Sequence, residues 1–191
     1  MHVITQLRAP AALGESMGWF DALVERAQDG DIAAFEQLAE RFLPDVYRLA
    51  LGIVGPDDAR DVAQDAMVAA WQMLPKLRDP TRFASWIHSI AVNRARNALR
   101  ARRRRPTIAL QDEHTGLLVA EPMTDVHLRM AVDSTLSVLK PDVREVLVLH
   151  YVLDLPLREV SGILGIREGT AKSRLNAGLR TLRAHMQEPM A

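Results

Sequence analysis

The chain contains no cysteine, and this absence excludes several kinds of chemistry. A disulfide framework, a thiolate metal site and a cysteine nucleophile all require a thiol. Aromatic residues are also scarce, at 5% of the 191 residues, and no stretch stays apolar for long enough to span a membrane. The first residues lack the basic segment and apolar core of a secretory signal. We therefore expect a soluble, cytoplasmic protein without membrane insertion.

Recognisable catalytic and metal-binding motifs are missing as well. The six histidines show no spacing such as HExxH, and no P-loop, GxSxG or GxGxxG occurs. Asp57, Asp58, Asp61 and Asp65 invite a reading as metal carboxylates, and Asp61 and Asp65 do share a helical face. Further oxygen ligands and a histidine are lacking, which favours a solvated or partner-binding face. We expect no enzyme activity, no metal and no cofactor.

The apolar residues that are present favour an all-α fold of two small helical domains. Apolar residues make up 48% of the chain, mostly Ala, Leu and Val, and they recur at spacings of three and four. Residues 1–16 read as a disordered tail, 17–105 as the first domain, 106–125 as a flexible linker, and 126–188 as the second domain. The linker is predicted from its prolines, glycine and acids and from its lack of any period.

Helix boundaries follow from turn and capping residues. In the first domain, one helical pattern of apolar core positions includes Ile32 and a second includes Met73. Asp31 is a plausible N-cap, Gly55-Pro56 a clear stop, and a new helix then runs to Pro75. The second domain is predicted to hold helices over 126–139, 141–153, 157–164 and 168–186.

Charge is sorted along the chain although the formal net charge is zero. The segment 88–105 carries seven arginines and no acid, whereas acidic residues outnumber basic ones before it. On a helical projection Ile87, Ile90, Ala91, Ala98 and Ala101 form the core face of this segment. Trp86, Asn93, Asn97, Arg100 and Arg104 share an edge, with Ser89, Arg96 and Arg103 beyond it.

That edge has two interpretations. An aromatic ring, amides and guanidinium groups together suit stacking on bases and neutralising phosphates. Alternatively, the tryptophan belongs to the core and the arginines favour the helix C-terminus electrostatically. The same choice applies to the final arginines, 102–105, which either grip phosphates or end the helix before Pro106.

The last two predicted helices show a helix-turn-helix pattern. Gly165 permits a left-handed turn between them, and the small Ser161 lets the second helix pack closely. The polar side chains of the second helix lie off its apolar stripe. In a helix-turn-helix, polar side chains at the start of this helix read base edges in the major groove. The alternative is a helical hairpin with a solvated polar face.

Taken together, these segments resemble the ECF (extracytoplasmic function) sigma factors of bacterial RNA polymerase over nearly all of 19–186. "DARDVAQDAMVAAW" resembles the family's polymerase-docking helix, "FASWIHSIAVNRARNALRARRRR" the segment that opens and reads the −10 promoter element, and the segment from Leu139 to Arg183 the domain that reads the −35 element. Ala171, where the family usually has valine, and Pro156, near a usual Ser or Thr cap, depart from the pattern.

The resemblance implies three sets of binding residues and three partners. Core polymerase, through its clamp coiled coil and flap, would be bound by Asp57, Asp61, Gln64, Asp65 and Trp71. The −10 strand would be bound by Lys76, Arg78, Phe83, Trp86, His88, Asn93, Arg96, Asn97, Arg100 and Arg103. The −35 duplex would be bound by Arg167, Glu168, Gly169, Thr170, Lys172, Ser173, Arg174, Asn176 and Arg180. An anti-sigma factor is the third expected partner.

Two other functions remain open at this stage. The chain also fits a stand-alone helix-turn-helix regulator whose N-terminal helices sense or dimerise, or an interaction protein whose basic helix end is incidental. The acidic helix around Asp61 discriminates among the three, since a free-standing repressor has no need of it.

Overall fold

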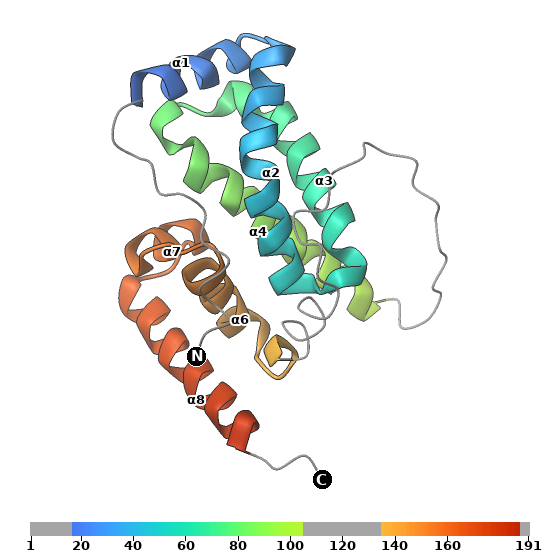
Figure 1. The fold of residues 1–191 in the computed structure, drawn as a ribbon, viewed down its shortest axis with the longest axis vertical. Coiled ribbons are helices and arrows are strands. Elements are labelled where there is room, and N and C mark those ends of the chain that lie inside the picture. Colours follow the sequence, from blue (N-terminus) through green and yellow to red (C-terminus); the bar gives the residue numbers. More distant parts are fainter. Residues whose placement is uncertain (1–16, 105–134, 188–191) are drawn as a thin grey trace.

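The computed structural model describes residues 17–104 and 135–187 of the chain. All regular elements within them are helical, which confirms the all-α prediction. The first group comprises α1 (Met17–Gln28), α2 (Ile32–Val54), α3 (Pro56–Met73) and α4 (Phe83–Arg104), with short 3₁₀ turns at Leu74–Lys76 and Pro80–Arg82. The second comprises α6 (Pro141–Leu147), α7 (Leu157–Leu164) and α8 (Glu168–Gln187) (Figure 1).

The first group is a bundle in which α1 lies across one end of the other three helices (Figure 1). Alanines on α3 lie against α2 and α4, and Ala59, Ala66 and Ala70 are fully buried. Such small side chains permit close helix packing. Three predicted core positions are wrong, because Ile32, Met73 and Ala101 are exposed near the ends of their helices.

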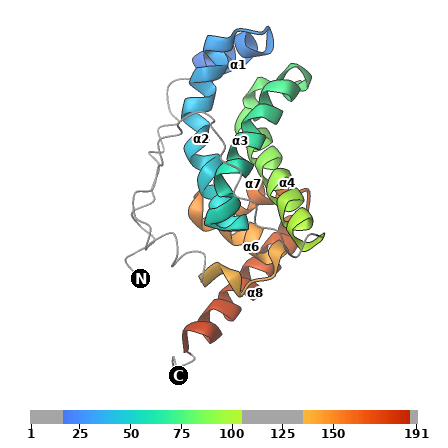
Figure 2. The same ribbon diagram turned by 90° about the vertical axis from the view of Figure 1, so that its right-hand side faces the viewer.

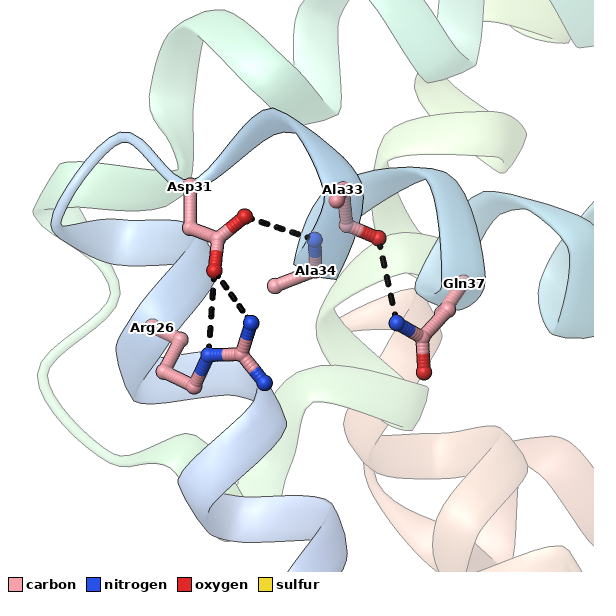
Figure 3. Close-up of polar contacts among 5 residues, drawn as sticks. All are labelled: Arg26, Asp31, Ala33, Ala34 and Gln37. Carbon is pink, nitrogen blue, oxygen red and sulfur yellow. Dashed lines mark hydrogen bonds and ion pairs between the residues drawn. The ribbon is translucent and has the colours of Figure 1, made fainter.

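The turn between α1 and α2 confirms the predicted N-cap. The Asp31 carboxylate accepts a hydrogen bond from the Ala34 backbone N–H at 3.1 Å and another from Arg26 Nε at 3.0 Å (Figure 3). An N-cap side chain satisfies a backbone N–H that has no partner within the helix. These bonds lower the pKa of Asp31, the Ala34 N–H contributing most.

The second group contains the predicted helix-turn-helix. Gly165 adopts the left-handed conformation, at φ 66°, between α7 and α8. Gly178 of α8 packs directly on α6, where an added Cβ would meet Leu147 and would lie 2.8 Å from Val143 Cγ1. The predicted helix over 141–153 changes character along its length: α6 is followed by a π-helical turn, Val148–Val152.

The two groups pack against each other along α2 and α4. Figure 2 shows α7 beside α4, and α6 reaches the C-terminal end of α2. Gly52 of α2 is a point of close approach, since an added Cβ there would lie 2.7 Å from Val148 Cγ2. The whole of the predicted linker, 106–125, and most of the predicted helix over 126–139 lie outside the described residues, so the predicted domain boundaries stay predictions.

Candidate nucleic-acid interface

The outer face of α3 is acidic. Asp57, Asp61, Gln64 and Asp65 are exposed on it, while Val62 and Ala66 turn inward. This division follows from the helical period, which separates the apolar positions from the polar ones. Asp57 also lies in the first turn, where a negative charge is favourable.

An apolar margin adjoins this acidic face. Trp71 is half-buried and its ring lies 4.9 Å from that of Phe35 on α2. Val68 is 50% exposed, one turn after Asp65, and was not among the predicted binding residues. Val68 follows Asp65 by three positions, and residues three apart lie next to each other on a helix surface, so this spacing was a signal that Val68 adjoins the acidic face.

The loop before α4 presents Lys76 and Arg78 to solvent from an anchored backbone. Gln28 Nε2 donates to the carbonyl oxygens of Leu77, at 2.5 Å, and Leu74, at 3.2 Å. Asp79 then caps the next turn, accepting from the Thr81 backbone N–H at 3.1 Å. The two cations are therefore held close to the start of α4.

The polar edge of α4 keeps much of the predicted arrangement. Asn93, Asn97, Arg100 and Arg103 are exposed, and Trp86 is half-buried. Arg100 Nη2 donates to Asn97 Oδ1 at 2.7 Å, which fixes the orientation of that amide. A row of guanidinium and amide donors beside an indole suits a single strand of nucleic acid.

Two residues predicted to contact the −10 strand, Phe83 and His88, are buried in the core. Phe83 is 0% exposed and its ring lies 5.2 Å from that of Phe42 and 5.7 Å from that of Trp86. Phe83 therefore supports Trp86 from beneath. His88 is 5% exposed, with its ring 6.3 Å from that of Phe42.

The burial of His88 has an electrostatic consequence. Its Nε2 is buried and has no hydrogen-bond partner among the described residues. Removal from water disfavours the charged imidazolium and lowers the pKa of His88 to about 4, with Asp45 opposing this shift and Arg48 adding to it. His88 is therefore a neutral core residue at physiological pH.

Arg96 is on the predicted edge, but its side chain is occupied. Its Nε and Nη2 each lie 2.7 Å from a Glu145 carboxylate oxygen, on α6 of the other helical group. The Glu145 side chain is 4% exposed and that of Arg96 33%. This bidentate bond raises the pKa of Arg96 further, against the opposing effect of burial. Sequence reasoning missed Glu145, although a carboxylate directly before the apolar run "VLVL" was a signal.

The first half of α8 and the turn before it present a polar surface. Its exposed members are Arg167, Glu168, Gly169, Thr170, Lys172, Ser173, Asn176 and Arg180. Ala171 and Leu175 are buried beneath them. Arg174 is different, since its Nε lies 3.2 Å from Asp142 Oδ2 and ties α8 to α6. Arg183, also exposed, extends the surface one turn beyond Arg180.

Within residues 17–104 and 135–187, no helix is both long and apolar enough to cross a membrane. The same ranges hold no cluster of His, Asp and Glu arranged to bind a metal ion.

Comparison with protein families gives two matches in chain order. Residues 38–105 match sigma-70 region 2, and residues 129–182 match sigma-70 region 4. The first match contains α3, the loop and α4, and the second contains the helix-turn-helix.

Among solved structures, CnrH in complex with the cytosolic domain of CnrY aligns with a TM-score of 0.67 and 26% identity, over 87% of this chain and 96% of that one. The sigma factor RpoE in complex with the anti-sigma factor NepR from Bartonella quintana shares the fold, with a TM-score of 0.62 and 21% identity, over 82% of this chain and 99% of that one.

The curated relatives cover most of the chain. The ECF RNA polymerase sigma-E factor of Escherichia coli (strain K12) is 34% identical over 165 residues, which is 80% of this chain and 86% of that protein. That of Haemophilus influenzae is 30% identical over 166 residues, 81% of this chain and 88% of the relative. The two region matches stand in this order, and the identity to the curated relatives extends across both regions. The chain therefore belongs to the ECF sigma factors, the promoter-specificity subunits of bacterial RNA polymerase.

Proposed function

We propose that this sigma subunit divides its work among three surfaces. The acidic face of α3 binds core polymerase, the loop and the polar edge of α4 capture the −10 strand, and the start of α8 reads the −35 duplex. One observation carries the proposal: the acidic face and the two nucleic-acid surfaces are solvent-facing polar sides of helices whose opposite sides form the core.

On the polymerase side, Asp57, Asp61, Gln64 and Asp65 bind the clamp coiled coil, with Trp71 and Val68 as the apolar margin. A protein interface with an apolar centre and a charged rim gains affinity from the apolar part and orientation from the charges. The second domain contacts the flap.

On the −10 side, Trp86 offers a stacking surface and the arginines bind phosphates. Stacking on an aromatic ring contributes roughly 1–3 kcal/mol per base in single-strand recognition. Asn93 and Asn97 supply amide groups suited to base edges. The set proposed here is Lys76, Arg78, Trp86, Asn93, Arg96, Asn97, Arg100 and Arg103, without the buried Phe83 and His88.

On the −35 side, α8 enters the major groove by its N-terminal half. Lys172, Asn176 and Arg180 lie on the exposed side of the helix and carry the donors that read guanine and adenine edges or bind phosphates. Arg174 is braced by Asp142 at one nitrogen, which leaves its terminal nitrogens for a phosphate.

The chain carries out no catalysis itself in this proposal and acts in the cytoplasm, where polymerase and promoters are. We further propose control by an anti-sigma factor. RpoE, a solved protein of the same fold, was captured with the anti-sigma factor NepR, and CnrH was captured with the cytosolic domain of CnrY. Because this chain has no cysteine, a thiol-based redox switch would have to lie in the partner.

Binding to purified bacterial core polymerase tests the docking surface. We expect the double variant Asp61→Asn, Asp65→Asn to lose core binding, because it removes both charges and keeps the side-chain shapes. The matched control Glu36→Gln, Glu40→Gln removes two exposed carboxylates of α2 and should bind like the wild type. Equal binding by the double variant and the wild type would contradict the assignment.

A further inference from the structure

A cavity of about 630 Å³ lies between the two helical groups. One wall comes from the loop before α4 and from the start of α4, where Arg82, Ser85 and Trp86 line it. The other wall comes from α7, through Arg158 and Gly162. Cavities of this volume hold small molecules and cofactors. The α7 wall belongs to none of the three surfaces proposed above, so those surfaces do not account for the cavity.

The lining of the cavity suits a flat ring. The Trp86 indole is half-buried, and the buried Phe83 ring supports it at 5.7 Å between ring centroids. On the α7 wall, Gly162 has no side chain, and a Cβ added there would have no heavy atom within 4 Å. The neighbouring Ile163 adds an apolar side chain to this wall. A ring that enters the cavity can therefore stack on the indole.

The lining also carries more positive than negative charge. It includes three arginines, Arg78, Arg82 and Arg158, and two carboxylates, Asp79 and Glu159. Asp79 Oδ1 already accepts from the backbone N–H and the hydroxyl of the residue two positions later, at 3.1 and 2.6 Å. Within residues 17–104 and 135–187, none of the three guanidinium groups has an ion-pair partner. Guanidinium groups bind phosphate oxygens through pairs of parallel hydrogen bonds.

Two hydroxyl groups on the α4 wall offer hydrogen-bond acceptors. Ser85 Oγ donates to the Arg82 carbonyl oxygen at 3.1 Å, and Ser89 Oγ donates to that of Trp86 at 2.7 Å. Because each hydroxyl proton is used inside α4, the oxygen lone pairs remain for a donor from a ligand. The exocyclic amino group of adenine or guanine is such a donor, whereas uracil carries no amino group.

We propose that this cavity is a binding site for a purine nucleoside triphosphate. The base stacks on Trp86, its amino group donates to the serine hydroxyls, and the phosphates bind the arginines of the loop and of α7. The inference goes beyond the proposed function, because the ligand is a free nucleotide and half of its site lies on α7. A ligand that binds only the native chain stabilises it increasingly as the ligand concentration rises.

Isothermal titration calorimetry of the whole chain with ATP tests the site. We expect saturable binding with a dissociation constant below about 1 mM, the range in which proteins bind cellular metabolites. Adenosine lacks the phosphates, inorganic triphosphate lacks the ring, and UTP lacks the amino group. Adenosine and inorganic triphosphate should each bind about tenfold more weakly than ATP, and UTP should also bind more weakly. Inorganic triphosphate that bound as tightly as ATP would overturn the proposal, because the arginines alone would then explain the binding.

Two variants of α7 locate the ligand. Gly162→Leu fills the cavity from the α7 wall without a change of charge, and leucine favours a helix more than glycine does. Arg158→Gln removes one guanidinium group. Each variant should weaken ATP binding about tenfold. The matched control Arg183→Gln changes an exposed arginine of α8 outside the cavity lining and should bind ATP like the wild type.

Thermal unfolding by circular dichroism shows whether each variant is folded and measures binding a second time. ATP should raise the melting temperature of the wild type and of Arg183→Gln, and should leave that of Gly162→Leu nearly unchanged. Unchanged ATP affinity in both folded α7 variants would overturn the proposal, since the nucleotide would then occupy only the surface proposed for the −10 strand. Core binding by the α3 variants is measured without ATP and tests only the proposed function.

Discussion

The buried His88 predicts a specific loss of stability in mild acid. Its folded-state pKa is about 4, against an ordinary value of 6.5. Between these values the unfolded chain binds a proton that the folded chain does not, so the free energy of unfolding falls as the pH decreases through this window. Applying the linkage relation to the two pKa values gives a loss of about 2 kcal/mol between pH 7.5 and pH 5, and about 3 kcal/mol once the pH is below 4.

The assay is urea unfolding followed by tryptophan fluorescence at both pH values. All three tryptophans lie in the first helical group, at Trp19, Trp71 and Trp86, so the signal reports the bundle that contains His88. Removing the imidazole in His88→Leu should remove this contribution, so the variant should lose about 2 kcal/mol less than the wild type between the two pH values. The comparison cancels the titration of the carboxylates, which both proteins share.

His185→Gln is the matched control, because this histidine is exposed on α8. It should show the pH dependence of the wild type. If His88→Leu and the wild type lost the same free energy between pH 7.5 and pH 5, His88 would not be the neutral core residue described here.

Two further predictions concern local structure. Gly178→Ala should destabilise the helix-turn-helix by about 1–3 kcal/mol, because overpacking against Leu147 and Val143 outweighs the gain in helix propensity. Gly162→Ala, with open space around the added methyl group, should be neutral or stabilising. Thermal unfolding by circular dichroism compares the two variants, and equal effects would contradict the packing described for Gly178. Asp31→Ala should lower the melting temperature by a few degrees, because the α2 N-cap is lost. Asp31→Asn should lower it less, because the amide oxygen still accepts a hydrogen bond from the Ala34 N–H. A larger fall in the melting temperature of the asparagine variant would contradict the capping role.

Local signals were sufficient to predict much of the fold from the sequence. The Asp31 cap, the stop at Gly55-Pro56 and the left-handed Gly165 depend on neighbours in the chain, so their residue types carry the information directly. The exposed sides of α3 and α8 follow from helical periodicity in the same way. Ala101 and Met73 were misplaced because periodicity does not tell where the neighbouring helix ends.

Properties that depend on distant packing could not be predicted. Phe83 and His88 lie on a helix that also carries exposed positions, and only the arrangement of α2 against α4 shows that these two are buried. Arg96 was predicted as an exposed DNA contact, but its partner Glu145 is 49 residues away. No spacing rule links residues so far apart, although a carboxylate directly before an apolar run does indicate a specific partner.

Run-off transcription tests the central claim most directly. Bacterial core polymerase is incubated with a pool of genomic fragments, with and without the chain. The account predicts discrete new transcripts that require the chain, that disappear with Asp61→Asn, Asp65→Asn, and that persist with the Glu36→Gln, Glu40→Gln control. DNA binding by the chain alone, together with no new transcript when core polymerase is present, would contradict the account.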